Sequence, residues 1–228
     1  MNKLFCLLIF ISAPVWASVE YISGEAKSRT GELKYKEQHT MTFDGQDLKR
    51  VETKYFNTQG EEFASLLSIF ESSSLLPTSV FSDKRTGKIE KTEVVGDKYK
   101  VTTIDAKGQA KSDELKIDSN MLCGQGYHNY IRANLNSFKE KEIREIKFII
   151  PSRRDYFSFD LSLLKQDKET KTFKLAITNW LLKMFADSIE VDYDHKGNLL
   201  AYRGLSNIQD SEGNNMDVVI TLNKVEGF

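Results

Sequence analysis

Apolar and polar residues alternate along most of this chain, and this period of two constrains the fold more than any other sequence feature. In one segment every second residue is large and apolar, namely Phe157, Phe159, Leu161 and Leu163. Successive side chains of a β-strand point to opposite faces, so the pattern indicates strands with one buried face. Turn-forming residues, such as those at 195–198, recur about every 8–12 positions, which is typical of antiparallel sheets. The chain is therefore predicted to be mainly β.

The number of expected strands determines the shape of the sheet. About a dozen antiparallel strands cannot stay open and flat without curling or splitting into two layers. One segment has a helical period instead, with an apolar stripe formed by Tyr127, Tyr130, Ile131, Leu135 and Phe138. We predict a strongly curved antiparallel sheet, or incomplete barrel, with one amphipathic helix near 126–138 on its concave face. A β-sandwich is the alternative.

A second apolar segment, residues 180–185, fits either a helical turn or a buried strand. No linker rich in Pro, Gly or Ser divides the chain, and no repeat of fixed period is present. Residues 18–228 are therefore expected to form a single β-rich domain.

The first 17 residues have the pattern of a cleaved export signal. Lys3 supplies the positive charge, residues 4–11 are apolar, and the segment ends in Val15-Trp16-Ala17. The apolar run is shorter than the roughly 20 residues that a membrane-spanning helix needs. We expect residues 1–17 to be a signal peptide and the mature protein to be periplasmic or secreted, with no transmembrane segment after cleavage.

Composition excludes several partners and cofactors. The chain has 32 Lys and Arg against 33 Asp and Glu, a balance that argues against nucleic acid as the main partner. After cleavage only Cys123 remains, so no internal disulfide forms, and the thiol is expected to be buried and inert. His39, His128 and His195 are not spaced to bind a metal together, so neither a metal nor another cofactor is expected.

Glu37 and His39 are the most informative polar residues. By alternation both project on the same face as Tyr35 and Met41, which is the apolar face. A buried carboxylate is costly unless it is paired. The two residues are therefore a polar pair inside a ligand cavity, a satisfied pair in the core, or a pair turned outward by a β-bulge.

Other catalytic patterns are weak. The chain has no nucleophile elbow, zinc-protease motif or phosphate-binding loop, so no catalytic residue is assigned. Glu190, Asp192 and Asp194 share one strand face, and paired carboxylates can act as acid and base. A solvated acidic face is the simpler explanation.

Six short segments, taken together, resemble a group of uncharacterised exported proteins of Gram-negative bacteria: 24–26 (GEA), 31–35 (GELKY), 83–87 (DKRTG), 150–153 (IPSR), 191–194 (VDYD) and 202–208 (YRGLSNI). This group brings no established activity to transfer. At the level of fold alone, a curved sheet that holds a helix is similar to the periplasmic lipoprotein carriers.

The leading hypothesis is a non-enzymatic envelope protein that binds a lipid or another apolar ligand on the concave face. Its expected ligand-binding residues are Glu37, His39, Tyr127, Phe159 and Leu161. The first alternative is a hydrolase with a dispersed site that uses the Glu37 and His39 pair or the Asp192 and Asp194 pair. The second is an interaction scaffold whose exposed edge strand pairs with an envelope protein partner.

Overall fold

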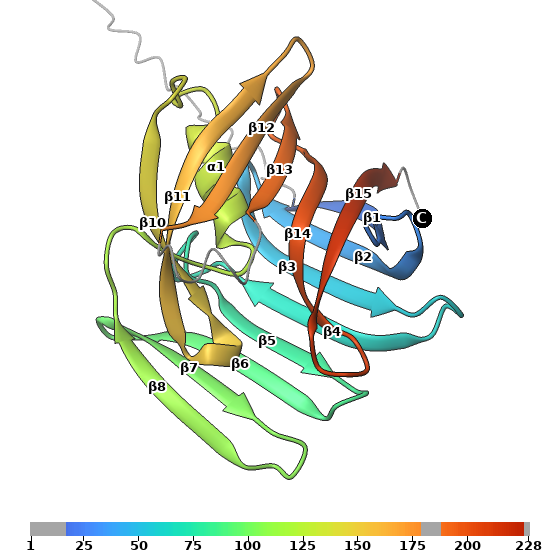
Figure 1. The fold of residues 1–228 in the computed structure, drawn as a ribbon. Helices are drawn as coiled ribbons and strands as arrows, with labels where there is room; N and C mark the ends of the chain where they lie inside the picture. The colour runs from blue at the N-terminus through green and yellow to red at the C-terminus, as the bar shows by residue number, and fades with distance from the viewer. Residues whose placement is uncertain (1–16, 179–187, 226–228) are drawn as a thin grey trace, which may run out of the picture.

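The structure is a computed structural model that describes residues 17–178 and 188–225 of the chain (Figure 1). Residues 1–16 of the expected signal peptide and the apolar segment at 180–185 lie outside the described residues. The strands are β1 (Ala17–Lys27), β2 (Leu33–Asp44), β3 (Asp47–Phe56), β4 (Glu62–Ile69), β5 (Thr78–Asp83), β6 (Lys88–Val95), β7 (Lys98–Ile104), β8 (Ala110–Lys116), β9 (Met121–Cys123), β10 (Ile143–Ile150), β11 (Asp155–Gln166), β12 (Thr170–Ile177), β13 (Ile189–Asp194), β14 (Leu199–Gln209) and β15 (Asn215–Val225). The helices are α1 (Gly126–Asn134) and the short 3-10 helix η1 (Pro151–Arg153).

All 15 strands belong to one sheet, in the order β8-β7-β6-β5-β4-β3-β2-β1-β15-β14-β13-β12-β11-β10-β9. Neighbours pair antiparallel, except that β9 runs parallel to β10. The chain moves outward from β1 to β8, continues at the far edge with β9, and returns to β15, which pairs with β1 in the middle. The single antiparallel sheet confirms the predicted fold class, and the sandwich alternative is wrong. The predicted number of strands, about a dozen, is lower than the 15 observed. The alternation of apolar and polar residues did not reveal β1, β9 and β10.

The sheet curls until its two edges approach each other, but it does not close (Figure 1). Residues 117–120 connect β8 directly to β9, yet these strands are not hydrogen-bonded neighbours within the described ranges. Side chains bridge the gap instead. Arg154, which follows η1, donates to Asp113 of β8 at 2.6 Å and to Thr103 of β7 at 3.0 Å. One apolar cluster spans both sides of this seam: Leu76, Tyr99, Val101, Met121, Cys123 and Ile149.

Helix α1 is shorter than the predicted range of 126–138, because it ends at Asn134. The Asn134 side chain donates to the Tyr130 carbonyl at 2.9 Å, and the Ser137 hydroxyl donates to the Asn134 carbonyl at 3.0 Å. Such local bonds compete with the helical hydrogen-bond pattern. Leu135 and Phe138 nevertheless stay buried, so the predicted apolar stripe continues past the end of the helix.

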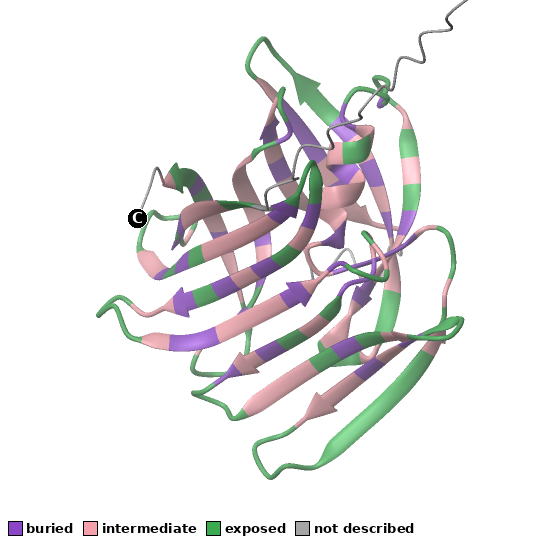
Figure 2. Cartoon of the chain, turned by 180° about the vertical axis from the view of Figure 1, so that it is seen from behind, coloured by how far each residue is buried: buried purple, intermediate pink, exposed green. Residues whose placement is uncertain are grey.

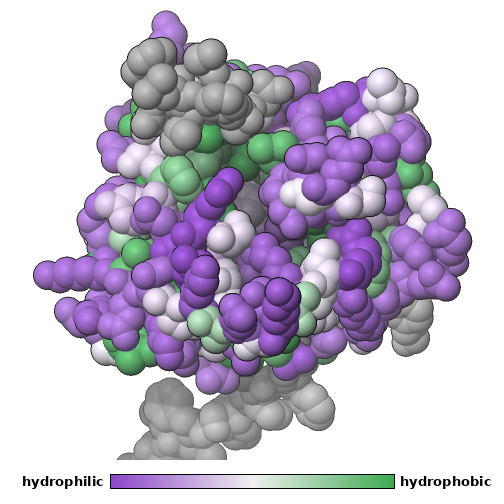
Figure 3. All heavy atoms as spheres, turned by 60° about the horizontal axis from the view of Figure 1, so that its bottom comes forward, coloured by the Kyte–Doolittle hydropathy of each residue, from purple (hydrophilic) through white to green (hydrophobic). Residues whose placement is uncertain are grey.

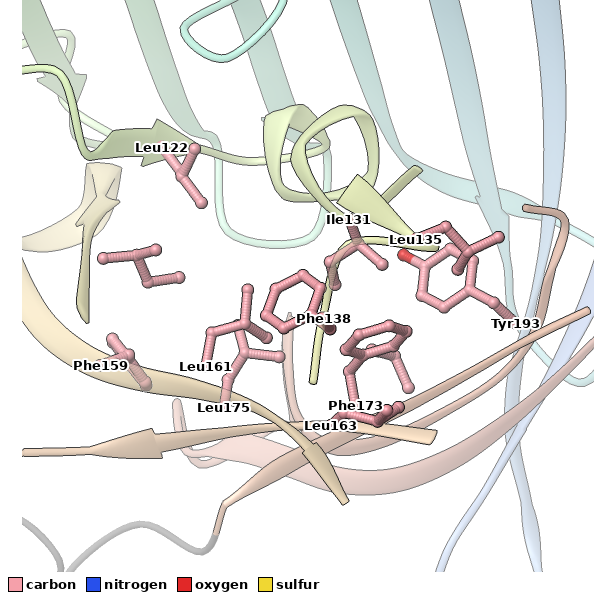
Figure 4. Close-up of a cluster of buried hydrophobic side chains, with 12 residues drawn as sticks. Leu122, Ile131, Leu135, Phe138, Phe159, Leu161, Leu163, Phe173, Leu175 and Tyr193 are labelled. Carbon is pink, nitrogen blue, oxygen red and sulfur yellow. The ribbon is translucent and has the colours of Figure 1, made fainter. Parts of the chain in front are cut away.

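This stripe packs against the inner face of β9 to β13 (Figure 4). The buried members of this first core cluster are Leu122, Ile131, Leu135, Phe138, Ile146, Phe159, Leu161, Leu163, Phe173, Leu175, Val191 and Tyr193. The helix therefore lies on the concave side, as predicted. Because burial of apolar surface contributes about 25 cal/mol per Å², this contact is a main source of stability for this half of the sheet.

A second core cluster covers the inner face of the other half. Its buried members are Ala26, Tyr35, Tyr55, Phe63, Ala64, Phe81, Ile208, Val218, Ile220 and Leu222. Leu199 and Tyr202 of β14 contact both clusters and so connect the two halves. Buried and exposed residues alternate along many of the strands, whereas the edge strand β8 is exposed almost throughout (Figure 2).

Cys123 is buried at the seam, 1% exposed, as a free thiol. Burial raises the pKa of this thiol to about 12, which agrees with the expectation of an inert cysteine. In the ranges that the structure describes, no helix has both the length and the apolar character needed to cross a membrane.

Candidate functional site

Glu37 and His39 lie on the inner side of β2, as the alternation predicts. Their side chains are 8% and 15% exposed, and His39 Nε2 lies 3.1 Å from Glu37 Oε1. Gly24 of β1 is the register partner of Glu37. A Cβ atom at Gly24 would lie 2.7 Å from Glu37 Cγ, so the glycine leaves the space that the glutamate occupies. The bulges in β2 lie elsewhere, so the third interpretation, an outward-turned pair, is wrong.

His39 links Glu37 to the start of α1 through two more polar side chains. His39 Nδ1 lies 2.8 Å from the hydroxyl of Thr53, a fully buried residue of β3. The amide of Gln125, directly before α1, donates to the same hydroxyl oxygen at 3.2 Å. These four residues, Glu37, His39, Thr53 and Gln125, are called the polar chain below. The polar chain joins the half of the sheet that contains β2 and β3 to the half that holds the helix.

Two oxygen atoms of the polar chain have no hydrogen-bond partner among the described residues. They are Gln125 Oε1, which is buried, and Glu37 Oε2. A carboxylate can accept about four hydrogen bonds, and Glu37 receives one. An unmet buried acceptor such as Gln125 Oε1 costs about 1–3 kcal/mol. Both oxygen atoms can therefore accept a hydrogen bond from a further donor.

Four tyrosines lie close enough to Glu37 to respond to its charge. Burial raises the pKa of each, and the negative charge of Glu37 raises it further: Tyr35, Tyr55, Tyr127 and Tyr202. They come from β2, β3, α1 and β14, so they approach the carboxylate from both halves of the sheet. The site is therefore a carboxylate in an aromatic environment.

Three of these tyrosine hydroxyls already have partners. Tyr35 lies 2.7 Å from the Ser206 hydroxyl, Tyr202 donates to the Leu205 carbonyl at 2.6 Å, and Tyr55 accepts from Asn207 at 3.4 Å. Tyr127 differs, because no hydrogen-bond partner of its hydroxyl is found in the described part of the chain. Its ring stacks on His128 with centroids 4.1 Å apart. Tyr127 is therefore a half-buried aromatic ring with a hydroxyl free to bind.

Phe159 and Leu161 lie in the core of the protein. They are 6% and 0% exposed and belong to the first core cluster. The apolar side chains that lie half-buried against this cluster are Leu75, Tyr127, Tyr130, Phe148, Phe157, Ile177, Ile189, Leu199 and Tyr202. Phe159 and Leu161 thus support the surface that a ligand would touch, and their predicted role in binding stays a prediction.

The acidic strand face is engaged in structural contacts. Asp192 accepts hydrogen bonds from Thr172 at 2.7 Å and from Arg203 at 2.6 Å. Burial raises the pKa of Asp192, but these bonds outweigh it and the pKa lies below its usual range. Asp194 accepts three hydrogen bonds from residues 196–198 in the following turn. Neither carboxylate is positioned as a free acid or base.

The other histidines lie outside the polar chain. His128 Nδ1 lies 2.5 Å from the Tyr193 hydroxyl, inside the first core cluster. Burial, and then the charges of His39 and Arg132, lower the pKa of His128 to about 3, so it is neutral at physiological pH. His195 is exposed and contacts the Lys168 carbonyl at 2.8 Å. In the described ranges, no group of three His, Cys, Asp or Glu residues is arranged to hold a metal ion.

Two small cavities open at the strands that carry the polar chain. One, of about 210 Å³, is lined by His39 and Ile22, together with Tyr21, Ser23, Gln38, Thr40, Glu52, Lys54 and Val225. The other, of about 310 Å³, has Tyr35, Phe63 and Met216 among its lining residues. Seen from below, the molecule is hollowed near the centre of the view, with hydrophilic residues around the hollow and a hydrophobic patch to one side (Figure 3).

Comparisons with known proteins show no family for this chain. No family model and no curated protein matches the chain. The chain is similar to the crystal structure of a beta-barrel-like protein of domain of unknown function DUF1849 from Brucella abortus. The TM-score is 0.41 and the identity 9%, over 92% of this chain and 94% of the other.

The alternation of apolar and polar residues predicts that Glu37 and His39 point inward. It does not reveal that Thr53, Gln125 and Tyr202 belong to the same site. Gln125 is 72 residues from Thr53 in sequence, and its contact depends on how the sheet curls. The sequence signal for the site is Gly24, which lies opposite the inward Glu37. This signal is informative only when the register of β1 and β2 is known.

Proposed function

We propose that this chain is an exported protein of the bacterial envelope that binds a lipid or another apolar ligand on the concave face of its sheet, without catalysing a reaction. The observation that carries the proposal is the set of half-buried aromatic and aliphatic side chains that lies over the first core cluster. Ligand sites are concave and mostly apolar, with a few polar groups that orient the ligand. Glu37, His39 and Tyr127 are the proposed polar groups.

The two alternative functions receive less support. A hydrolase that uses Asp192 and Asp194 would have to release both side chains from their hydrogen bonds. A scaffold that adds a partner strand would use the edge strand β8, whose side chains are nearly all exposed. The charged residues on β8 oppose such pairing: Lys111, Asp113, Glu114 and Lys116.

The proposal is tested with an apolar fluorescent probe, N-phenyl-1-naphthylamine, added to the purified mature chain. Binding in the concavity is expected to raise the fluorescence, and sodium dodecanoate is expected to displace the probe. In Phe157→Asp a charge enters the half-buried surface, which should lower probe affinity at least about tenfold. Leu164→Asp is the matched control, because Leu164 lies on the same strand and is 49% exposed.

Circular dichroism must show that both variants remain folded. Equal loss of binding in Phe157→Asp and Leu164→Asp would contradict the proposed site. Absence of saturable binding in the wild type would overturn the proposed function itself.

Export is proposed on the signal-peptide pattern alone. In cells of a Gram-negative host, the full-length protein is expected in the periplasmic fraction, with an intact mass that begins at Ser18. A cytoplasmic protein that keeps residues 1–17 would contradict this.

A further inference from the structure

We propose that the Glu37 carboxylate, which lies near four tyrosines, binds the positively charged ammonium group of an amphiphile whose chain lies on the concave face. This inference rests on the proposed function and adds the chemical class of the head group to it. The observations that carry it are the Glu37 oxygen without a hydrogen-bond partner, the absence of a lysine or arginine paired with Glu37 in the described ranges, and the tyrosines near the carboxylate.

The hydrogen bonds of the polar chain use only one oxygen of Glu37. Gln125 donates to the Thr53 hydroxyl at 3.2 Å, and His39 Nδ1 lies 2.8 Å from the same hydroxyl. His39 Nε2 lies 3.1 Å from Glu37 Oε1. Glu37 Oε2 is left without a hydrogen-bond partner among the described residues.

No arginine or lysine in the described ranges forms an ion pair with Glu37. Arg29 donates two hydrogen bonds to Asp217, and the Arg132 guanidinium lies 5.6 Å from the centre of the Phe43 ring. Lys36, beside Glu37 in sequence, is 52% exposed and lies 3.6 Å from Glu25. A buried carboxylate is costly unless it is paired. The free Glu37 oxygen therefore favours a cationic group from outside the chain.

The aromatic neighbours favour the same class of ligand. Tyrosine rings attract cations through their negative faces, and aromatic side chains around a carboxylate are suited to ammonium groups. Tyr35 and Tyr55 are in edge contact with centroids 6.0 Å apart, and Tyr202 contacts both core clusters. The Tyr127 hydroxyl adds an acceptor for an N–H group. An anionic head group would instead meet the charge of Glu37 directly.

The test compares two amphiphiles with the same chain, dodecylamine and sodium dodecanoate, below their micellar concentrations at neutral pH. Isothermal titration of the mature chain is expected to give at least about tenfold tighter binding of the amine. Glu37→Gln keeps the size and the acceptor for His39 but removes the charge, so it should reduce this preference at least about tenfold. Glu52→Gln is the control, since Glu52 carries the same charge on β3 and is paired with Arg50.

Each outcome separates the two proposals. Equal affinity of the wild type for the two amphiphiles, or a preference for dodecanoate, would overturn the ammonium site and leave the apolar site standing. An unchanged preference in Glu37→Gln would also overturn it. Failure of both amphiphiles to bind would overturn the proposed function as well. If Glu37→Gln does not fold, the test rests on the wild-type preference and on Tyr127→Phe. Tyr127→Phe is expected to weaken the binding of dodecylamine severalfold and to change the binding of dodecanoate little.

Discussion

Gly24 of β1 faces Glu37 of β2 across the centre of the sheet, and the absence of a side chain at Gly24 makes room for the glutamate. The two residues are register partners, and a Cβ atom at position 24 would lie 2.7 Å from Glu37 Cγ and 3.1 Å from Glu37 Oε1. The glycine on β1 thus provides the space that the buried Glu37 carboxylate on β2 occupies. This relationship links the local geometry of β1 to the proposed binding chemistry.

Gly24→Ala is therefore expected to destabilise the protein by about 1–3 kcal/mol, because the added methyl group meets Glu37 and the side chain of Leu222 at 3.0 Å. Urea unfolding followed by circular dichroism measures the change. Ser23→Ala, one residue away on the other face, should change stability by no more than about 0.5 kcal/mol. Equal stability of Gly24→Ala and wild type would show that Glu37 moves aside freely.

Leu161→Ala tests whether Leu161 belongs to the core. The side chain is 0% exposed within the first core cluster, so its removal should leave a cavity and cost about 2–5 kcal/mol. Leu164→Ala, on the exposed side of the same strand, is expected to be nearly neutral. A loss of apolar binding in Leu161→Ala at unchanged stability would instead place this residue in direct contact with the ligand.

His128 is expected to make stability depend on pH. Burial lowers its folded-state pKa from the ordinary 6.5 to about 3. Below about pH 6.5 the unfolded chain binds a proton at His128 that the folded protein does not bind. The contribution of neutral His128 to stability is therefore complete above pH 6.5 and is lost as the pH falls toward 3. Between these values, the unfolding free energy of His128→Gln should fall less steeply than that of wild type, by about 1.4 kcal/mol per pH unit. Parallel curves would contradict this assignment.

The seam between the sheet edges is expected to open locally when Arg154 is replaced. Its side chain, 25% exposed, reaches Asp113 and Thr103 across the gap. Arg154→Ala should cost no more than about 1 kcal/mol in global stability, because such ion pairs are partly solvated. Hydrogen exchange of the β8 amides should nevertheless become several times faster. The neighbouring Arg153→Ala should leave exchange unchanged, and equal exchange in both variants would argue against the bridging role of Arg154.

The fold was predictable wherever one strand face is apolar and the other polar. In β11 the alternation of Phe159 and Leu161 with polar residues gave the strand directly, and its burial follows the same period. The pattern of β10 is less regular, since Ile149 interrupts the alternation and the buried residues Ile146 and Ile149 are three positions apart. Helix α1 showed a related difficulty: the apolar period continues to Phe138, but side-chain hydrogen bonds at Asn134 end the helix earlier.

The candidate site was predictable only in its local part. The inward direction of Glu37 and His39 follows from the period of β2, because side-chain direction in a strand depends on position alone. Their partners depend on strand register and on the curvature of the sheet. Gln125 reaches Thr53 because α1 begins on the concave side, and Tyr202 belongs to β14, which is far from β2 in the sequence. No local pattern contains that information.

The central claim is that the concave face holds an apolar ligand. The most direct measurement is native mass spectrometry of the protein expressed with its own leader and purified gently from the periplasm, combined with organic extraction of the same sample. The account predicts a discrete adduct at constant stoichiometry that disappears in Phe157→Asp and persists in Leu164→Asp. A clean apo mass, with no lipid in the extract, would contradict it and identify the half-buried side chains as ordinary core surface.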